Sequence, residues 1–192
     1  MVSEGRLVYF HFGTRKIVEA AAVLLRLEPN GRMGRLRLLK LLYIADREAL
    51  SETARPVIGT RPVAMDMGPV HSEVLDLING EHSDDAQWAE FICRDGRHEI
   101  QLIKNPGVSS LSRYEIEKLN RVSREYWDTE DWELVEITHD FPEWTRNHRP
   151  GTSMSIPMED IIEAVGRAED RDEILQDAAE TKAVRRLLGR LG

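Results

Sequence analysis

The sequence predicts a mainly α-helical α+β fold in one compact domain, and three observations support this prediction. Apolar residues recur at helical spacing in several segments. One segment has the composition of a β-hairpin, so a small antiparallel β element is expected among the helices. The length of 192 residues suits one domain with a sizeable core, and neither a repeat nor a linker divides the chain. We therefore expect a single domain over residues 1–192.

The first two helices are expected at residues 14–28 and 36–50. Apolar side chains line one face of the first segment, and the breaker run Glu28-Pro29-Asn30-Gly31 ends it. In the second segment, apolar residues from Leu38 to Ala45 cover most of the helix circumference. We therefore expect the second helix to be the central, largely buried helix of the domain.

Two later segments predict β structure. Residues 55–69 combine prolines and glycines with β-branched residues, which favours a short irregular strand at a sheet edge. A helix over about 70–78 is expected after it. Residues 89–103 contain two apolar runs on either side of Asp95-Gly96, a pair suited to the two-residue type I′ turn of a hairpin.

Four helices are expected in the C-terminal half, at 112–127, 130–138, 157–165 and 171–188, the last within a charged C-terminal segment of about 169–190. Ser112 and Glu115 form a capping-box pattern at the start of the first of these helices. Trp127, Trp132 and Trp144 are expected to anchor the core, although tryptophan is also a common anchor of protein interfaces.

The chain is acidic, because 34 Asp and Glu residues outnumber 26 Lys and Arg residues, for a formal net charge of −8. Proteins that bind nucleic acids are usually basic, since released counterions supply most of their non-specific affinity. The charge balance therefore argues against a nucleic-acid partner. A local cluster of Arg32, Arg35, Arg37 and Lys40 leaves three interpretations: a solvated face paired with acids, a contact patch for an acidic partner, or the DNA-binding surface of an autoregulator.

Several features favour a soluble protein of the cytoplasm. The N-terminal residues lack the pattern of a signal peptide, and no apolar stretch approaches the roughly 20 residues that cross a bilayer. The single cysteine, Cys93, cannot form an internal disulfide, which agrees with a reducing compartment. We expect no contact with a membrane.

No motif indicates catalysis, a metal or a cofactor. The six histidines and Cys93 lack zinc-ligand spacing, and the glycine-rich loops that hold nucleotides are absent. A small hydrolase could be assembled from His139, Asp140 and either Ser72 or Ser109, and this is the alternative to a binding protein. We expect no catalytic residue, no cofactor, no metal and no small-molecule substrate.

Two short stretches contain polar or flexible residues with more than one interpretation. Asp46 and Arg47 either mark the point where the second helix leaves the core or form an orienting polar pair beside a binding surface. In the run Met65-Asp66-Met67-Gly68-Pro69-Val70, the methionines suit either the core or an adaptable protein-binding surface. At least one of the two methionines is expected to fill the core.

A series of short pieces follows in a set order along the chain. The first are Leu38-Leu39-Lys40-Leu41-Leu42-Tyr43-Ile44-Ala45-Asp46, Gly59 with Met65, and Gly68-Pro69-Val70 followed by Val74. The later ones are Leu111-Ser112-Arg113-Tyr114-Glu115-Ile116 with Val122, Thr138-His139-Asp140 with Trp144, and Ile156-Pro157. Together these pieces, over about residues 14–165, resemble the Panacea domain of SocA-like antitoxins.

The resemblance implies the antitoxin half of a bacterial toxin–antitoxin pair, and related domains also occur in phage-associated proteins. Such a protein neutralises its cognate toxin by direct binding, and some members hand the toxin to a protease. No catalytic residue is implied. The positions expected to bind the partner or to maintain the motif are Lys40, Tyr43, Asp46, Arg47, Met67, Gly68, Pro69, Val70, His139 and Trp144.

Overall fold

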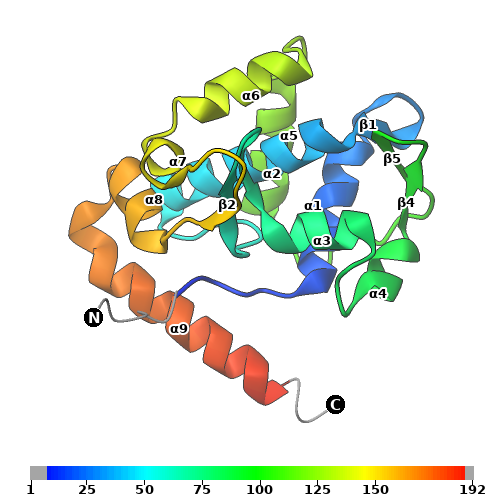
Figure 1. The fold of residues 1–192 in the computed structure, drawn as a ribbon. Coiled ribbons are helices and arrows are strands. Elements are labelled where there is room, and N and C mark those ends of the chain that lie inside the picture. The colour runs from blue at the N-terminus through cyan, green and yellow to red at the C-terminus, as the bar shows by residue number, and fades with distance from the viewer. Residues whose placement is uncertain (1–7, 189–192) are drawn as a thin grey trace.

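The computed structural model describes residues 8–188, and its elements are arranged around helix α2 (Arg35–Thr53). Helix α2 contacts α1 (Thr14–Leu25), α5 (Arg113–Glu125), α6 (Asp131–His139) and strand β3 (Gly68–His71). Figure 1 shows α2 crossing the middle of the molecule with these elements around it. The predicted central, buried helix is thus confirmed, and its apolar circumference is explained by neighbours on several sides.

Two small antiparallel sheets of three strands each complete the α+β fold. In the first, β5 (Glu99–Leu102) lies between β1 (Arg32–Gly34) and β4 (Ile92–Asp95). In the second, β2 (Pro62–Met65) lies between β3 and β6 (Met154–Ser155). The third strand of each sheet, β1 or β6, comes from a distant part of the chain. It pairs with the edge of a two-stranded hairpin that would otherwise be open.

The hairpin expected near 89–103 is present as β4 and β5, but its turn differs from the prediction. Asp95 pairs with Glu99, so three residues, Gly96 to His98, form the loop. A type I′ turn requires a positive φ at both central residues. Among these residues only Gly96 has one, with φ 70°, because Asp95 is still part of the strand. The expected two-residue turn at Asp95-Gly96 was therefore wrong.

The segment over 55–69 was expected to lie at a sheet edge, and this prediction was wrong for β2. Strand β2 is the central strand of its sheet, with β3 on one side and β6 on the other. Its proline stands at the first position, where the missing N–H interrupts no ladder. The carbonyl of Pro62 instead accepts a hydrogen bond from the backbone N–H of Ile156, at 3.0 Å.

The remaining helices are α3 (Ser72–Asn79), α4 (Asp85–Ala89), α7 (Pro142–Asn147), α8 (Met158–Ala164) and α9 (Arg171–Leu188), with short 3-10 turns at Pro29–Gly31 and Ala168–Asp170. Helices α4 and α7 were not predicted, because five or six residues are too few to show helical periodicity. The predicted capping box of α5 is confirmed by reciprocal hydrogen bonds between Ser112 and Glu115. Within residues 8–188, no helix is both long and apolar enough to cross a membrane.

The charged C-terminal segment forms α9, which packs on the body of the molecule near the irregular N-terminal segment, residues 8–13 (Figure 1). Ile174 and Ala178 are buried in a cluster with Phe10, whereas Val184 and Leu187 are 55% and 62% exposed. Residues 189–190, the end of the expected charged segment, lie outside the described residues.

Two of the three tryptophans expected in the core are at the surface. Trp127 is 48% exposed and Trp132 is 60% exposed, so the prediction was wrong for both. Trp132 lies on α6, whose buried positions are Leu134, Val135 and Thr138, and its own side chain points away from that face. Trp144 is half-buried and packs against the second apolar cluster.

Candidate functional site

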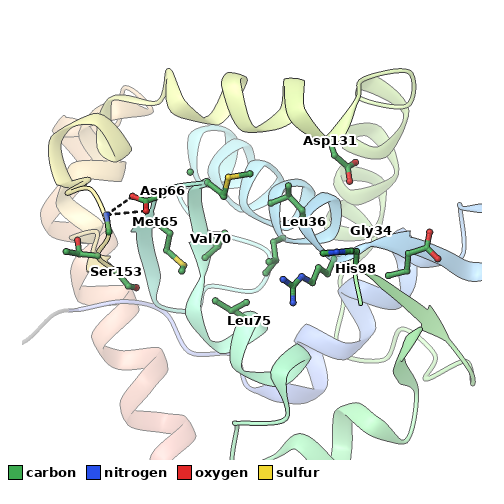
Figure 2. Close-up of a pocket in the computed structure, with 16 residues that line it drawn as sticks. Gly34, Leu36, Met65, Asp66, Val70, Leu75, His98, Asp131 and Ser153 are labelled. Atoms are coloured by element: carbon green, nitrogen blue, oxygen red, sulfur yellow. Dashed lines mark hydrogen bonds between the residues drawn. The ribbon is translucent and has the colours of Figure 1, made fainter. Parts of the chain in front are cut away.

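A groove of about 910 Å³ opens between the start of α2, the β2–β3 hairpin, the turn before β5 and the loop over 151–153. Its apolar lining is Leu36, Leu39, Met65, Met67, Val70 and Leu75, and its polar lining includes Arg35, Asp66, His98, Glu99, Asp131 and Ser153. Figure 2 shows Asp66 and Ser153 at one end and Gly34 and His98 at the other, with Val70 and Leu75 between them.

The hairpin turn at the groove depends on Gly68. Its φ of 90° lies in the left-handed region that favours glycine. A Cβ atom added there would lie 2.6 Å from both the Nζ of Lys40 and the Oγ1 of Thr138. Two independent features, backbone conformation and space, therefore require glycine at the first position of β3.

Gly68→Ala is expected to lower the free energy of unfolding by about 1–3 kcal/mol, because the added methyl group strains the turn and crowds two polar side chains. Urea unfolding of the variant and the parent measures the difference. Gly80→Ala is the control, because Gly80 also has a positive φ of 75° but its added Cβ would meet nothing within 4 Å. Equal losses in the two variants would show that crowding by Lys40 and Thr138 contributes nothing.

Lys40 supports the hairpin from beneath. Its side chain is fully buried, and its Nζ donates a hydrogen bond to the carbonyl of Pro69 at 3.0 Å. Burial lowers the pKa of the Lys40 amine to about 7, because a charged ammonium loses its hydration in the protein interior. The Lys40 amine thus bonds α2 to β3, and it contributes no exposed positive charge to the surface.

A stack of three aromatic rings holds the other side of the hairpin turn. The ring of Trp144 lies between those of His139 and His148, with centroid distances of 4.0 Å and 4.4 Å. Each ring also binds the turn: Trp144 Nε1 donates to the carbonyl of Met65, His139 Nε2 lies 3.1 Å from the carbonyl of Asp66, and His148 Nε2 lies 2.9 Å from its carboxylate. The stack therefore fixes the position of a groove-lining turn.

The Asp66 carboxylate joins the hairpin to the far wall of the groove. It accepts hydrogen bonds from the backbone N–H of Gly151, at 3.0 Å and 3.2 Å to its two oxygens, as Figure 2 shows. The bond to His148 and the bond from Gly151 hold the pKa of Asp66 below its ordinary value. Loop 151–153 is thereby held beside the hairpin, and together they close one end of the groove.

Further along α2, a polar cluster is buried against α7. Glu143 is fully buried, and its Oε1 accepts hydrogen bonds from the Tyr43 hydroxyl at 3.1 Å and from Arg47 Nε at 2.9 Å. Burial, together with the nearby Glu143 carboxylate, raises the pKa of Tyr43 well above its ordinary value. Tyr43 therefore stays protonated and donates to Glu143, which links α2 to α7.

Asp46 fixes the loop that enters β2. Its carboxylate accepts hydrogen bonds from the backbone N–H groups of Ile58 and Gly59, at 2.8 Å and 2.9 Å. The Nε2 atom of His71 lies 3.3 Å from the same carboxylate, and burial lowers the pKa of that imidazole. Asp46 is only 5% exposed, so it has not left the core at the end of the helix. Its interactions hold both ends of the β2–β3 hairpin near α2.

A family model described as antitoxin SocA-like, Panacea domain, matches residues 38–145, which is more than half of the chain. The chain belongs to this SocA-like Panacea family. Comparison with curated proteins gave no match, and comparison with solved structures gave none. We call residues 38–145 the Panacea region; it begins within α2, ends within α7 and contains the hairpin, the polar cluster around Glu143 and the supports Lys40, His139 and Trp144, whereas His148 and Gly151 follow it.

The structure assigns the expected site residues to three places. Met67, Gly68 and Val70 line the groove. Lys40, Pro69, His139 and Trp144 support the hairpin from behind, and Tyr43, Asp46 and Arg47 form buried contacts further along α2. Most of these residues of the Panacea region therefore position the groove rather than line it.

Three important residues were not singled out from the sequence. Asp66 lies between two methionines in a turn, and this polar residue at an apolar site is a signal that could have been used. His148 is two residues before Pro150, in a segment without periodicity, and Glu143 looks like a surface glutamate of a short helix. Their roles depend on partners 82 and 96–100 residues away.

The arrangement required for a hydrolase is not assembled around His139. Its Nε2 contacts a backbone carbonyl, and its ring lies on that of Trp144. The hydroxyl groups of Ser72 and Ser109 are bonded to Arg61 and Glu19, respectively. Across residues 8–188, no group of three or more His, Cys, Asp or Glu side chains has the arrangement of a metal site.

The basic cluster at the start of α2 is largely paired or buried. Arg32 forms an ion pair with Asp95, and Arg37 lies 3.7 Å from Glu28 and donates to the carbonyls that follow α5. Lys40 is buried, and Arg35 lines the groove. These placements favour the interpretation of charges paired with acids over that of an open basic surface.

Proposed function

We propose that this protein is an antitoxin of the bacterial cytoplasm that neutralises a cognate toxin protein by direct binding. Membership of the SocA-like family supports an antitoxin role in general. The observation that carries the proposal of direct binding is the open groove whose lining comes mostly from the Panacea region. Large apolar surface concavities with a polar rim are typical of binding sites, and an antitoxin needs such a surface for its toxin.

The support behind the groove agrees with a binding role. Lys40, the Trp144 stack and the bond from Gly151 to Asp66 each fix the hairpin turn from a different side. A surface held in its binding conformation loses less conformational entropy when a partner binds. These contacts would therefore raise affinity for a partner without any chemical step.

The proposal is tested by growth of bacteria that express the product of the open reading frame next to the gene for this chain. We expect that product to stop growth, co-expression of this chain to restore it, and the two proteins to purify together. Cells with the toxin and an empty vector are the control. A harmless neighbouring product, or toxicity that this chain leaves unchanged, would contradict the proposal.

The same cells distinguish a blocked toxin from a degraded one. If this chain only covers the toxin, the amount of toxin on an immunoblot stays constant after new synthesis is stopped. If this chain acts as an adaptor for a protease, the toxin disappears only when the chain is present, and deletion of the protease restores it.

A further inference from the structure

We propose that the groove accepts a basic, amphipathic helix of the partner protein. This inference names the chemistry of the partner segment and rests on the proposed function, in which the partner is a protein. Its basis is the combination of an apolar floor, an exposed tryptophan beside it and a mainly acidic rim.

The floor of the groove provides the apolar contact. Leu36, Leu39, Val70 and Leu75 come from α2, β3 and α3, and they line one continuous cavity. Met67 lies on the rim, where it is 44% exposed and its flexible thioether can adapt to a partner. Apolar side chains of a partner would be buried here, which favours binding in proportion to the area removed from water.

Helix α6 extends this surface along one side. Trp132, Glu136 and His139 are spaced four and three residues apart, so they share one flank of the helix. Asp131, at the start of this helix, lines the groove, so the first turn of α6 borders the groove. Trp132 is 60% exposed and directly follows the groove-lining Asp131 in the chain. Exposed tryptophans are common anchors of protein interfaces.

The charge of the rim selects the partner. Asp66, Glu99 and Asp131 line the groove together with Arg35, and the Asp131 carboxylate also lies 3.6 Å from the guanidinium of Arg37. Residues 128–140, which include α6, contain six acidic residues and neither lysine nor arginine. Opposite charges steer association and disfavour wrong partners, so the partner segment should be basic outside its apolar stripe.

A helix suits the groove better than an added strand. A strand would have to pair with an open sheet edge, and the edge strands that line the groove are β1, which has only three residues, and β3. All four residues of β3 are buried, so its backbone is not available to a partner. A helix needs no backbone partner, because its hydrogen bonds are internal, and it presents apolar side chains every three or four residues.

The probes are three fluorescein-labelled synthetic peptides of about 18 residues, long enough for about five helical turns. The first has a leucine stripe at helical spacing and lysine elsewhere, the second has glutamate in place of lysine, and the third has the first composition scrambled so that the stripe is lost. Fluorescence anisotropy with the full chain measures affinity. We expect the basic striped peptide to bind at least about tenfold more tightly than either of the others.

Three variants locate the binding site. Met67→Lys adds charge at the rim and is expected to weaken binding of the basic peptide about tenfold, and Glu136→Lys about three- to tenfold. Leu187→Lys is the matched control, because it makes a similar change at an exposed position of α9 and should leave affinity unchanged. Circular dichroism melting curves verify that each variant is folded.

Equal affinity for the basic and acidic peptides, or unchanged affinity in Met67→Lys and Glu136→Lys, would overturn the inference. If growth is restored while these variants and peptides show no preference, the antitoxin proposal stands and the groove proposal falls. If the basic peptide prefers the groove but the neighbouring gene product is not neutralised, the chemistry of the groove stands and the antitoxin proposal falls.

Discussion

Glu143→Ala is expected to lower the free energy of unfolding by about 3–5 kcal/mol, because it breaks a buried ion pair from one side. Glu143 is fully buried and holds both Arg47 and Tyr43 through one oxygen. Without it, the guanidinium of Arg47, which is 22% exposed, loses its carboxylate, and the Tyr43 hydroxyl loses its acceptor. A buried polar group that loses its partner costs more than the original interaction contributed.

Urea unfolding followed by tryptophan fluorescence measures this loss. Glu143→Gln separates charge from hydrogen bonding, because the amide oxygen can still accept from Tyr43 while the negative charge is removed. We expect Glu143→Gln to be intermediate between Glu143→Ala and the parent. Glu163→Ala is the control for a surface glutamate, since Glu163 is 58% exposed and bonded to Arg146, and it should change stability much less than Glu143→Ala does. A similar effect of both alanine variants would contradict the importance of the buried cluster.

Lys40→Met is expected to change stability in opposite directions at low and high pH. The pKa of Lys40 is about 7 in the folded protein, below its ordinary value of 10.5. Between these two values the unfolded chain binds a proton that the folded chain does not, so the free energy of unfolding rises with pH over this range. Below about pH 7 both states are charged, and the full cost of burying the ammonium, on the order of 4–5 kcal/mol, is present.

Methionine removes this cost together with the hydrogen bond to the Pro69 carbonyl, which contributes about 1 kcal/mol. We therefore expect Lys40→Met to be more stable than the parent at pH 6.5, by on the order of 3 kcal/mol, and slightly less stable at pH 10. Urea unfolding at the two pH values checks both signs.

Lys104→Met is the matched control for Lys40→Met, because the side chain of Lys104 is 60% exposed. Its difference from the parent should stay small and should not change sign with pH. If Lys40→Met destabilised the protein equally at both pH values, the amine would have no energetic cost of burial, and its role would be reduced to packing.

The stability predictions for Glu143 and Lys40 both concern contacts of α2 that also position the groove. Lys40 and Tyr43 lie three residues apart on α2. Lys40 bonds α2 to β3, and Tyr43 bonds α2 to α7. The hairpin between β2 and β3 is therefore positioned by residues that a partner would never touch. Substitutions at these supports should lower affinity indirectly, whereas substitutions at Met67 should lower affinity with little effect on stability.

Sequence patterns alone identified the elements whose signal is local. The apolar circumference of residues 38–45 identified the buried α2, and Ser112 with Glu115 marked the start of α5. The resemblance of several short motifs to those of the Panacea family is confirmed by the family model. These signals are readable because helix periodicity and capping depend on residues only three or four positions apart.

Only the tertiary structure revealed the features that depend on residues far apart in the sequence. The groove combines residues from 34–39, 65–75, 98–99 and 151–153 with Asp131, and no local pattern connects these segments. The same holds for the burial of Glu143, the exposure of Trp132 and the central place of β2, each of which was missed or predicted wrongly. The exposure of a side chain, and the free-energy cost of burying its charge, depend on the residues that pack against it. Here those residues are distant in the sequence and come together only in the folded protein.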